Sequence, residues 1–256
     1  MKIAENVYGI RTGISNVIII TGLGPTKQDY VLIDAGMPFC GSYLQKTLKK
    51  LAGEKKPLAI ILTHGHFDHI GAIPHLFKSW DVPIYAHEKE LPYLKGEKVY
   101  DPPHPFRIKG VLSFMSPFYP RDGIVITDFI KPLENSENIP YLDGWQIIHT
   151  PGHTEGHISL FRNHDRLLLA GDAIITVKQE SLLAVLQQKK EIHGPPAYFT
   201  PDRYQAKQSI VKLAEYMPEI LYSGHGKPMY GQELTTELKK LIKQYEWERE
   251  NAPSFS

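Results

Sequence analysis

Hydrophobic and polar positions along the N-terminal third of the chain follow a pattern typical of short β-strands. Residues 7–10, 16–21 and 30–33 are rich in β-branched and aromatic side chains, and segments containing glycine and proline separate them. These runs predict an antiparallel meander that feeds a larger sheet. A helix is predicted to follow from Ser42 to Ala52.

The centre of the chain combines buried strands with one helix. The apolar run at residues 58–62 predicts a short buried strand. Apolar side chains at helical spacing then predict a helix over residues 68–77. Pro74 lies inside this segment, so we expect the helix to be short or kinked. Another short strand is predicted at residues 82–86.

Strands and helices also share the second half of the chain. The pattern predicts strands at residues 124–126, 145–148, 158–161, 166–170 and 220–222. It predicts helices over residues 182–188, 202–217 and 232–250.

Regular periodicity breaks down between residues 96 and 120. Residues 101–106 are rich in proline, and Phe114, Phe118 and Tyr119 follow them. A long, aromatic insertion of this kind is typical of a lid or a pocket wall. A loop that packs its own aromatic side chains is the alternative, and the sequence leaves both interpretations open.

Composition limits the class of protein. With 256 residues we expect a single domain spanning 1–256, and 29 basic against 28 acidic residues give no basic excess that would indicate nucleic acid as a partner. The chain has no apolar signal segment and no window approaching ~18 continuous apolar residues. We therefore expect a cytoplasmic protein without membrane association. The single cysteine, Cys40, excludes an internal disulfide and is interpreted as a buried small side chain rather than a nucleophile.

Candidate chemistry begins where the predicted strand at residues 58–62 ends. The sequence Thr-His-Gly-His-Phe-Asp-His follows it directly. In a sharply turning loop, His64 and His66 can reach one metal ion, while Asp68 and His69 can reach a second. Imidazole nitrogen and carboxylate oxygen together suit divalent zinc, manganese or iron.

Three further strand ends carry side chains of the same types. His153 lies at the tip of a Pro-Gly-His-Thr turn, Asp172 follows a glycine, and His225 lies in a Ser-Gly-His-Gly turn. The seven candidate ligands divide into His64, His66 and His153 for one ion and Asp68, His69 and His225 for the other, with Asp172 between them. Each set leaves a position open for water, as catalytic metal sites do.

Other polar residues near these turns have supporting roles in our interpretation. His149 and His157 are each interpreted as a residue that forms hydrogen bonds around the site or as a core histidine, rather than as a ligand. Asp34 is either catalytic or a buried carboxylate that bonds the ligand loop. His87 and Glu88 are interpreted as helix-capping residues or as partners of the ligands.

This set of ligands predicts hydrolytic chemistry. Water held between two cations loses a proton near neutral pH, and the bridging hydroxide is then a nucleophile. The ions also polarise the carbonyl or phosphoryl oxygen under attack. Asp68 is the candidate catalytic residue, because its carboxylate can receive the proton released as the tetrahedral species forms.

The order of the motifs resembles the metallo-β-lactamase superfamily. His-x-His-x-Asp-His after a strand, Thr-Pro-Gly-His-Thr, Gly-Asp and Ser-Gly-His-Gly extend over nearly the whole chain. The resemblance implies a mixed α/β fold, the four-layer αβ/βα sandwich, with a dinuclear site at one edge whose ligands match the seven residues above. It implies two divalent metal ions, for which we expect zinc, with iron or manganese as alternatives. Residues 178–181 and 194–200 are similar to a little-characterised bacterial branch of general metallo-hydrolases.

Departures from better-known members of that superfamily narrow the substrate. Asp172 stands where the commonest zinc β-lactamases have cysteine, which disfavours β-lactam hydrolysis. Ile175 stands where quorum-signal lactonases have a pocket tyrosine, which weakens that assignment. We expect a small-molecule substrate with an ester, lactone or thioester carbonyl. The alternative is a phosphodiesterase or nuclease, which the near-neutral net charge disfavours.

Overall fold

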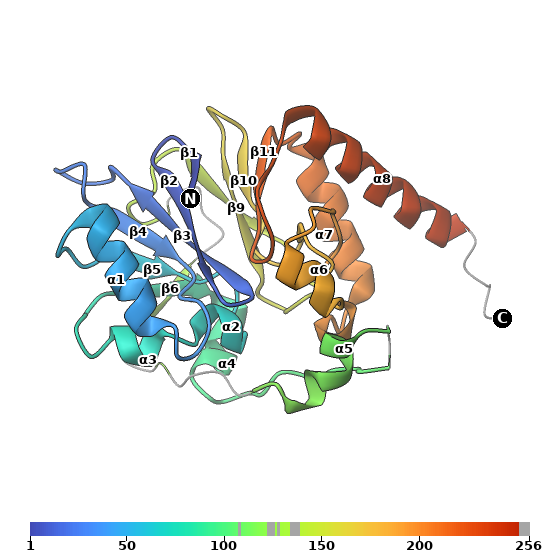
Figure 1. Cartoon of the computed structure of the whole chain (residues 1–256), viewed down its shortest axis with the longest axis horizontal. Coiled ribbons are helices and arrows are strands. Elements are labelled where there is room, and N and C mark those ends of the chain that lie inside the picture. The colour runs from blue at the N-terminus through green and yellow to red at the C-terminus, as the bar shows by residue number, and fades with distance from the viewer. Residues whose placement is uncertain (107–108, 122–125, 127–128, 134–138, 251–256) are drawn as a thin grey trace.

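Two β-sheets pack face to face in the computed structural model, and helices cover both outer faces (Figure 1). The structure describes residues 1–106, 109–121, 126, 129–133 and 139–250, with side chains as far as residue 245. This arrangement confirms the αβ/βα sandwich that the family resemblance implied.

The first sheet has seven strands that lie in chain order. They are β1 (Lys2–Ala4), β2 (Val7–Thr12), β3 (Ser15–Thr21), β4 (Tyr30–Ile33), β5 (Ala59–Ile61), β6 (Ile84–His87) and β7 (Ile130–Leu133). Strands β1 to β4 pair antiparallel, which confirms the predicted meander, and β4 to β7 pair parallel. The ligand-bearing turn therefore leaves the sheet at the edge where β4, β5 and β6 all end.

The second sheet has five strands in the spatial order β12-β11-β10-β9-β8. They are β8 (Trp145–His149), β9 (Ile158–Arg162), β10 (Leu167–Leu169), β11 (Ile220–Tyr222) and β12 (Met229–Tyr230). Strand β9 is antiparallel to both β8 and β10, and β10 is parallel to β11. Consequently β8, β10 and β11 run in one direction and end at one edge of the sheet.

The alternation of side chains along the central strands explains the layers. In β4, Val31 and Ile33 pack against residues of the second sheet such as Leu160. Tyr30 and Leu32 point the other way and pack among residues of the covering helices. A strand that is buried on both faces is apolar at every position, as the run at residues 30–33 is.

Helices on each outer face bury an apolar stripe against the sheets. The helices are α1 (Gly41–Ala52), α2 (Phe67–Ile70), α3 (Ile73–Leu76), α4 (Leu91–Leu94), α5 (Val111–Met115), α6 (Leu182–Gln187), α7 (Arg203–Glu215) and α8 (Gly231–Glu250), with short 3-10 turns η1 (Glu88–Glu90), η2 (Ser116–Phe118) and η3 (Ala197–Phe199). Figure 1 shows α1 and α3 beside the first sheet and α7 and α8 beside the second. Of the helices in the described part of the chain, none is long and apolar enough to cross a bilayer.

The predicted helix over residues 68–77 is divided into two short helices, α2 and α3, as the proline suggested. Gly71 separates them at a point where an added Cβ would overlap Pro38. Pro74 lies in the first turn of α3, where its missing N–H has no helical partner to lose.

One predicted strand lies largely outside the described residues. Residues 124–125 of the expected strand at 124–126 lie outside the described residues, and Ile126 is not in a strand. The last strand of the first sheet among the described residues is β7, which was not predicted and contains Pro132. Because β7 is an edge strand, a proline without an N–H is tolerated there.

The interpretation of Cys40 as a buried side chain was wrong. Cys40 is only half-buried and lies at the N-terminal end of α1. It follows Phe39, whose ring is fully exposed, so the chain crosses the protein surface at this point.

Candidate metal centre

Four turns meet at one edge of the two sheets. They follow β5, β8, β10 and β11, whose shared directions bring their carboxyl ends together. All seven predicted ligands lie in these turns or directly after them, and all are buried: His64, His66, Asp68, His69, His153, Asp172 and His225.

The seven side chains form three overlapping groups, within each of which the ligand atoms lie within 4.8 Å of one another. The groups are His64, His66 and His153; Asp68, His69 and His225; and His64, His69 and Asp172. The first two are the sets predicted from the sequence. Asp172 Oδ2 lies 3.0 Å from His225 Nε2 and 3.5 Å from His153 Nε2, so this carboxylate faces both sets.

Three buried atoms of this cluster have no hydrogen-bond partner among the described residues. They are His64 Nε2, His69 Nε2 and Asp172 Oδ1. An unsatisfied buried polar atom costs about 1–3 kcal/mol, yet nitrogen and carboxylate oxygen are the ligand atoms that zinc, iron and manganese prefer. The donor set therefore fits divalent metal ions.

Asp34, directly after β4, holds the ligand turn in place. Its Oδ1 accepts a hydrogen bond from the Thr63 N–H and its Oδ2 one from Thr63 Oγ1, both at 2.8 Å. Since the only hydroxyl proton of Thr63 goes to Asp34, His64 Nδ1 must donate to Thr63 Oγ1, 3.0 Å away. This leaves His64 Nε2 unprotonated and directed at the cluster.

Asp34 also orients a second ligand. Its Oδ2 lies 2.8 Å from His69 Nδ1, which leaves His69 Nε2 facing the other ligands. Of our two interpretations of Asp34, the geometry supports the buried carboxylate that positions the ligands.

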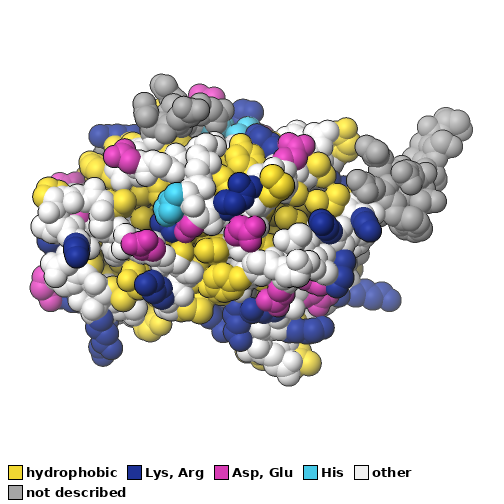
Figure 2. All heavy atoms as spheres, turned by 90° about the horizontal axis from the view of Figure 1, so that it is seen from above, with side chains coloured by type: hydrophobic (Ala, Val, Ile, Leu, Met, Phe, Trp, Pro, Cys, Tyr) yellow, Lys and Arg dark blue, Asp and Glu magenta, His cyan; other side chains and the backbone are white. Residues whose placement is uncertain are grey.

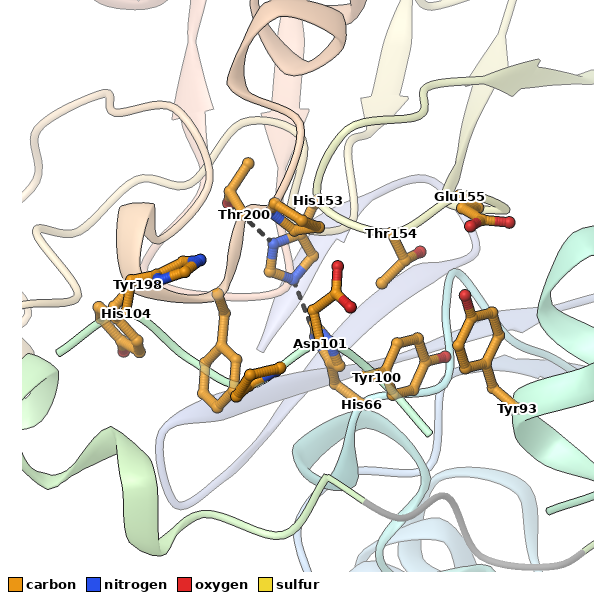
Figure 3. Close-up of a pocket in the computed structure, with 13 residues that line it drawn as sticks. His66, Tyr93, Tyr100, Asp101, His104, His153, Thr154, Glu155, Tyr198 and Thr200 are labelled. Carbon is orange, nitrogen blue, oxygen red and sulfur yellow. Dashed lines mark hydrogen bonds between the residues drawn. The ribbon is translucent and has the colours of Figure 1, made fainter. Parts of the chain in front are cut away.

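Other ligands are oriented through their second ring nitrogen in the same way. His153 Nδ1 lies 3.3 Å from Thr200 Oγ1, and His225 Nδ1 donates to the carbonyl oxygen of Ile14 at 2.8 Å. In Figure 3, His66 and His153 point toward each other, with His66 Nδ1 3.0 Å from His153 Nε2.

His157 has the supporting role that was predicted for it. Its Nε2 accepts a hydrogen bond from the Asp172 N–H at 2.9 Å, and its Nδ1 lies 2.8 Å from Thr150 Oγ1. Burial lowers the pKa of His157 to about 3, so the ring is neutral and can accept. His157 thereby fixes the backbone of Asp172.

The remaining predicted partners lie away from the cluster. His149 stacks on His87 with ring centroids 4.3 Å apart, and its Nε2 lies 2.9 Å from the Glu155 carbonyl oxygen. His87 caps η1 by accepting a hydrogen bond from the Lys89 N–H, and Glu88 is exposed. The capping interpretation of His87 is thus confirmed.

Protonation differs between the two predicted sets. Burial lowers the pKa of His66 to about 4 and holds the pKa values of His64 and His153 well below the usual range. These three imidazoles are neutral at physiological pH, which is the form that binds metals.

In the second set, the carboxylates of Asp68 and of the shared Asp172 determine the direction of the pKa shifts of the imidazoles. Burial opposes protonation of His69 and His225, but Asp172 and Asp68 outweigh it and raise the pKa of both imidazoles. Burial also opposes ionisation of Asp172, yet His225 and His69 hold its pKa well below the usual range. Negative charge at this end of the cluster therefore attracts cations.

Two cavities open beside the cluster. The first, about 450 Å³ of partly open space, is bordered by His66, His153, Tyr93, Tyr100, Asp101, Pro102, His104, Thr154, Glu155, Tyr198, Phe199, Thr200 and Pro201 (Figure 3). The second, about 320 Å³, is bordered by Ile14, His66, Phe67, Asp68, Tyr119, His153, Asp172, Gln179, Pro196, Tyr198, Phe199 and His225. The segment at residues 96–120 contributes to the walls of both. Among the described residues, no lysine or arginine lines either cavity.

One buried acidic residue near the ligands escaped prediction. Glu90 at the end of η1 is fully buried and accepts hydrogen bonds from the backbone N–H groups of Gly65 and Gly156. The only sequence signal is that Glu90 is the last charged residue before the apolar residues of α4, and the preceding Glu88 and Lys89 resemble an exposed helix surface.

Comparisons with known proteins agree with this geometry. A family model described as the metallo-beta-lactamase superfamily matches residues 10–225. A Bacillus subtilis (strain 168) protein named probable metallo-hydrolase YflN is 48% identical over 239 residues, which cover 93% of this chain and 90% of that protein. The metallo-beta-lactamase family protein TTHA1429 from Thermus thermophilus superposes with a TM-score of 0.67 at 17% identity, covering 97% of this chain and 82% of that one. TTHA1623, solved in a di-iron-bound form, gives a TM-score of 0.57 at 24% identity, covering 88% of this chain and 93% of that one.

Proposed function

The chain belongs to the metallo-beta-lactamase superfamily, and we propose that it is a dinuclear metal-dependent hydrolase of small esters, lactones or thioesters. One ion would be held by His64, His66 and His153 and the other by Asp68, His69 and His225, with Asp172 shared between them. The observation that carries this proposal is the buried cluster of seven ligand side chains beside two cavities, in which three atoms have no hydrogen-bond partner among the described residues.

The metal ligands, Asp68 and the aromatic residues of the cavity wall have separate roles in the proposed reaction. Bound metal ions supply a water acidified to near neutral pH and polarise the oxygen of the bond under attack. Asp68 borders the second cavity, and its Oδ2 lies 3.4 Å from His225 Nε2, so we propose that it receives the proton released during attack. Phe67, Tyr119 and Phe199 on the cavity wall limit the access of bulk water.

The lining of the cavities favours a neutral carbonyl substrate. Phosphodiesters and glutathione thioesters carry negative charge that enzymes neutralise with lysine or arginine, and the described residues around these cavities include neither. Asp101 and Glu155 would instead repel an anion at the mouth of the first cavity.

Nucleic-acid processing is the alternative within the same superfamily. A nuclease needs a basic surface that follows the phosphate backbone. On the face shown in Figure 2, basic and acidic side chains are interspersed, and the net charge of the chain is only +1. These observations support a small-molecule substrate.

The identity of the metal follows from ligand chemistry only in part. The histidines and carboxylates of the cluster accept zinc, iron and manganese, and we propose zinc as the resident metal. The di-iron-bound neighbour TTHA1623 makes iron the main alternative. The cytoplasmic location expected from the sequence stays a prediction.

We also propose that the segment at residues 96–120 is a wall of the substrate pocket. Tyr100, Asp101 and His104 border the first cavity, and Tyr119 borders the second. Tyr119 also packs against Phe67 with ring centroids 5.7 Å apart, which joins the segment to the ligand turn. Its movement as a lid and the extent of the domain stay predictions.

A panel of substrates tests the proposal. Metal-loaded protein should hydrolyse some member of a panel of aryl esters, lactones and thioesters, and should leave bis-aryl phosphate esters intact. Turnover of the phosphate diesters alone would promote the alternative. If no panel member is hydrolysed by protein that holds its metals, the carbonyl hydrolase proposal is wrong.

A further inference from the structure

Glu90 occupies an unusual place, because it lies between the two turns that carry the ligands of one ion. It is 0% exposed, and its carboxylate has four hydrogen-bond donors. Its Oε2 accepts from the Gly65 N–H at 3.0 Å and from the Tyr100 hydroxyl. Its Oε1 accepts from Thr154 Oγ1 at 2.5 Å and from the Gly156 N–H at 2.9 Å.

The arrangement of the donors requires a carboxylate. Each carboxylate oxygen of Glu90 accepts one hydrogen bond from a backbone N–H and one from a hydroxyl group. A glutamine amide would direct its NH2 group at one of the backbone N–H groups in either orientation, and a backbone N–H cannot accept a hydrogen bond. No neutral side chain of this shape satisfies all four donors.

The donors belong to the metal-ligand turns and to the pocket wall. Gly65 lies between His64 and His66, and Thr154 follows His153 directly. Tyr100 belongs to the segment at residues 96–120, and its ring packs edge-on against the His66 ring with centroids 4.6 Å apart. Figure 3 shows Tyr93 and Tyr100 side by side at the border of the first cavity, where their rings stack at 4.3 Å.

Both glycines in this network are sites of close approach. A Cβ added at Gly65 would overlap the Tyr100 hydroxyl, and one added at Gly156 would lie 2.8 Å from Glu90 Cγ and Glu90 N. A side chain at Gly156 would therefore displace Glu90 itself, and a side chain at Gly65 would displace its partner Tyr100.

We propose that Glu90 is a positioning residue that fixes the distance between the His64–His66 turn and the His153 turn, and that couples Tyr100 of the pocket wall to the same metal ligands. This inference rests on the proposed function, since it assumes that those histidines hold a metal ion. Glu90 itself contacts none of the seven ligand side chains through a hydrogen bond that the structure shows among its described residues. It acts through Gly65, Thr154 and Gly156.

The test compares Glu90→Gln with a matched control on the full chain. Glu180→Gln makes the same chemical change at another buried carboxylate, outside both ligand turns. For each variant and for the wild type, metal affinity is measured by competition with a chelator, kcat and KM with an aryl ester, and the urea midpoint with metal-free protein. Loss of an outer partner of metal ligands typically lowers affinity or activity about 10- to 100-fold.

We expect Glu90→Gln to lower metal affinity and kcat by such a factor, with Glu180→Gln close to the wild type in both. Tyr100→Phe and Thr154→Val each delete one donor and should give smaller losses that largely disappear in the Glu90→Gln background, because the partners are coupled. If Glu90→Gln does not fold, these two single variants decide: reduced metal affinity in both supports the proposal, and unchanged affinity in both overturns it.

Two failures are distinguishable. A Glu90→Gln protein with a lower urea midpoint but wild-type metal affinity and kcat would give Glu90 a structural role only and would overturn the inference. A wild type that binds no metal would instead refute the proposed function on which the inference rests.

Discussion

The two halves of the candidate metal centre differ in charge as well as in ligand type. One half consists of His64, His66 and His153, whose imidazoles burial keeps neutral. The other half consists of Asp68, His69 and His225, and Asp68 together with the shared Asp172 raises the pKa of both imidazoles. The first half therefore offers a metal ion neutral imidazole nitrogens, whereas the second offers negative charge that protons neutralise until a metal ion replaces them.

The two halves also differ in the groups that orient their predicted ligands. In the neutral half, Thr63 and Thr200 contact the outer nitrogens of His64 and His153. In the charged half, the Asp34 carboxylate contacts His69. Asp172 faces both halves, so it is the residue whose loss should remove the distinction altogether.

The largest effect is expected from Asp172→Ala. The substitution removes the oxygens that face His153, His69 and His225, so both halves should lose metal and turnover should fall below detection. The loss of activity should exceed the decrease of about 10- to 100-fold that is typical when a residue that only supports a metal ligand is removed. Initial rates and metal content report the effect, and circular dichroism checks the fold. Full turnover in this variant would remove Asp172 from the mechanism.

Removing one ligand from a single half should have a smaller effect on metal content than Asp172→Ala. His153→Ala removes a ligand from the neutral half only, and His225→Ala removes one from the charged half only. We expect each variant to retain about one metal ion per chain while activity falls sharply, because the partner set keeps its three ligands. Metal content after dialysis is the measurement. Loss of both ions in each variant would mean that the halves do not bind independently.

Asp34→Asn should cost about 10- to 100-fold in metal affinity or activity, because the amide cannot accept from Thr63 and His69 as the carboxylate does. Chelator competition measures the change. Asp165→Asn is the control, since Asp165 pairs with Arg162 through its two oxygens outside the ligand turns. Equal metal affinities in the two variants would contradict the positioning role of Asp34.

The smallest expected effect is a pH dependence of opposite sign in the two halves of the metal-free protein. The folded pKa of His66 is about 4 against an ordinary 6.5, so its contribution to stability is lost as pH falls below 6.5. The folded pKa of His69 is raised, so its contribution is complete below 6.5 and is lost as pH rises through the folded pKa.

Imidazole NMR signals of metal-free protein between about pH 4 and 9 measure this contrast. We expect His66 to stay neutral at about pH 6 and His69 to stay protonated above its ordinary value of 6.5. Two imidazoles that titrate together near the ordinary value would contradict the assignment of neutral and charged halves.

Much of the site could be predicted because its signals are local. Each turn that carries predicted ligands directly follows a short apolar strand, and parallel strands bring such turns to one edge, so the positions of the predicted ligands follow from short-range sequence. His157 could be assigned a supporting role because its turn already supplied a better-exposed ligand at the tip. The αβ/βα sandwich was implied by the resemblance of the ordered motifs to the metallo-β-lactamase superfamily.

What could not be predicted depends on distant contacts. The two interpretations of Asp34 differ only in which atoms lie near its oxygens, and Thr63 lies 29 residues away. In the sequence, Glu90 resembles an exposed helix residue. Its burial depends on a donor at Gly156, which is 66 residues away along the chain and leaves no local signal. Strand β7 was missed because Pro132 weakens the strand signal, and its acceptance depends on the position of β7 at the sheet edge.

Metal content of the purified, dialysed protein tests the central claim most directly. Elemental analysis should find about two divalent ions per wild-type chain, because two complete sets of predicted ligands are buried together and three atoms of the cluster have no hydrogen-bond partner among the described residues. A protein that retains no metal ion after incubation with zinc, iron or manganese would contradict the assignment of the site.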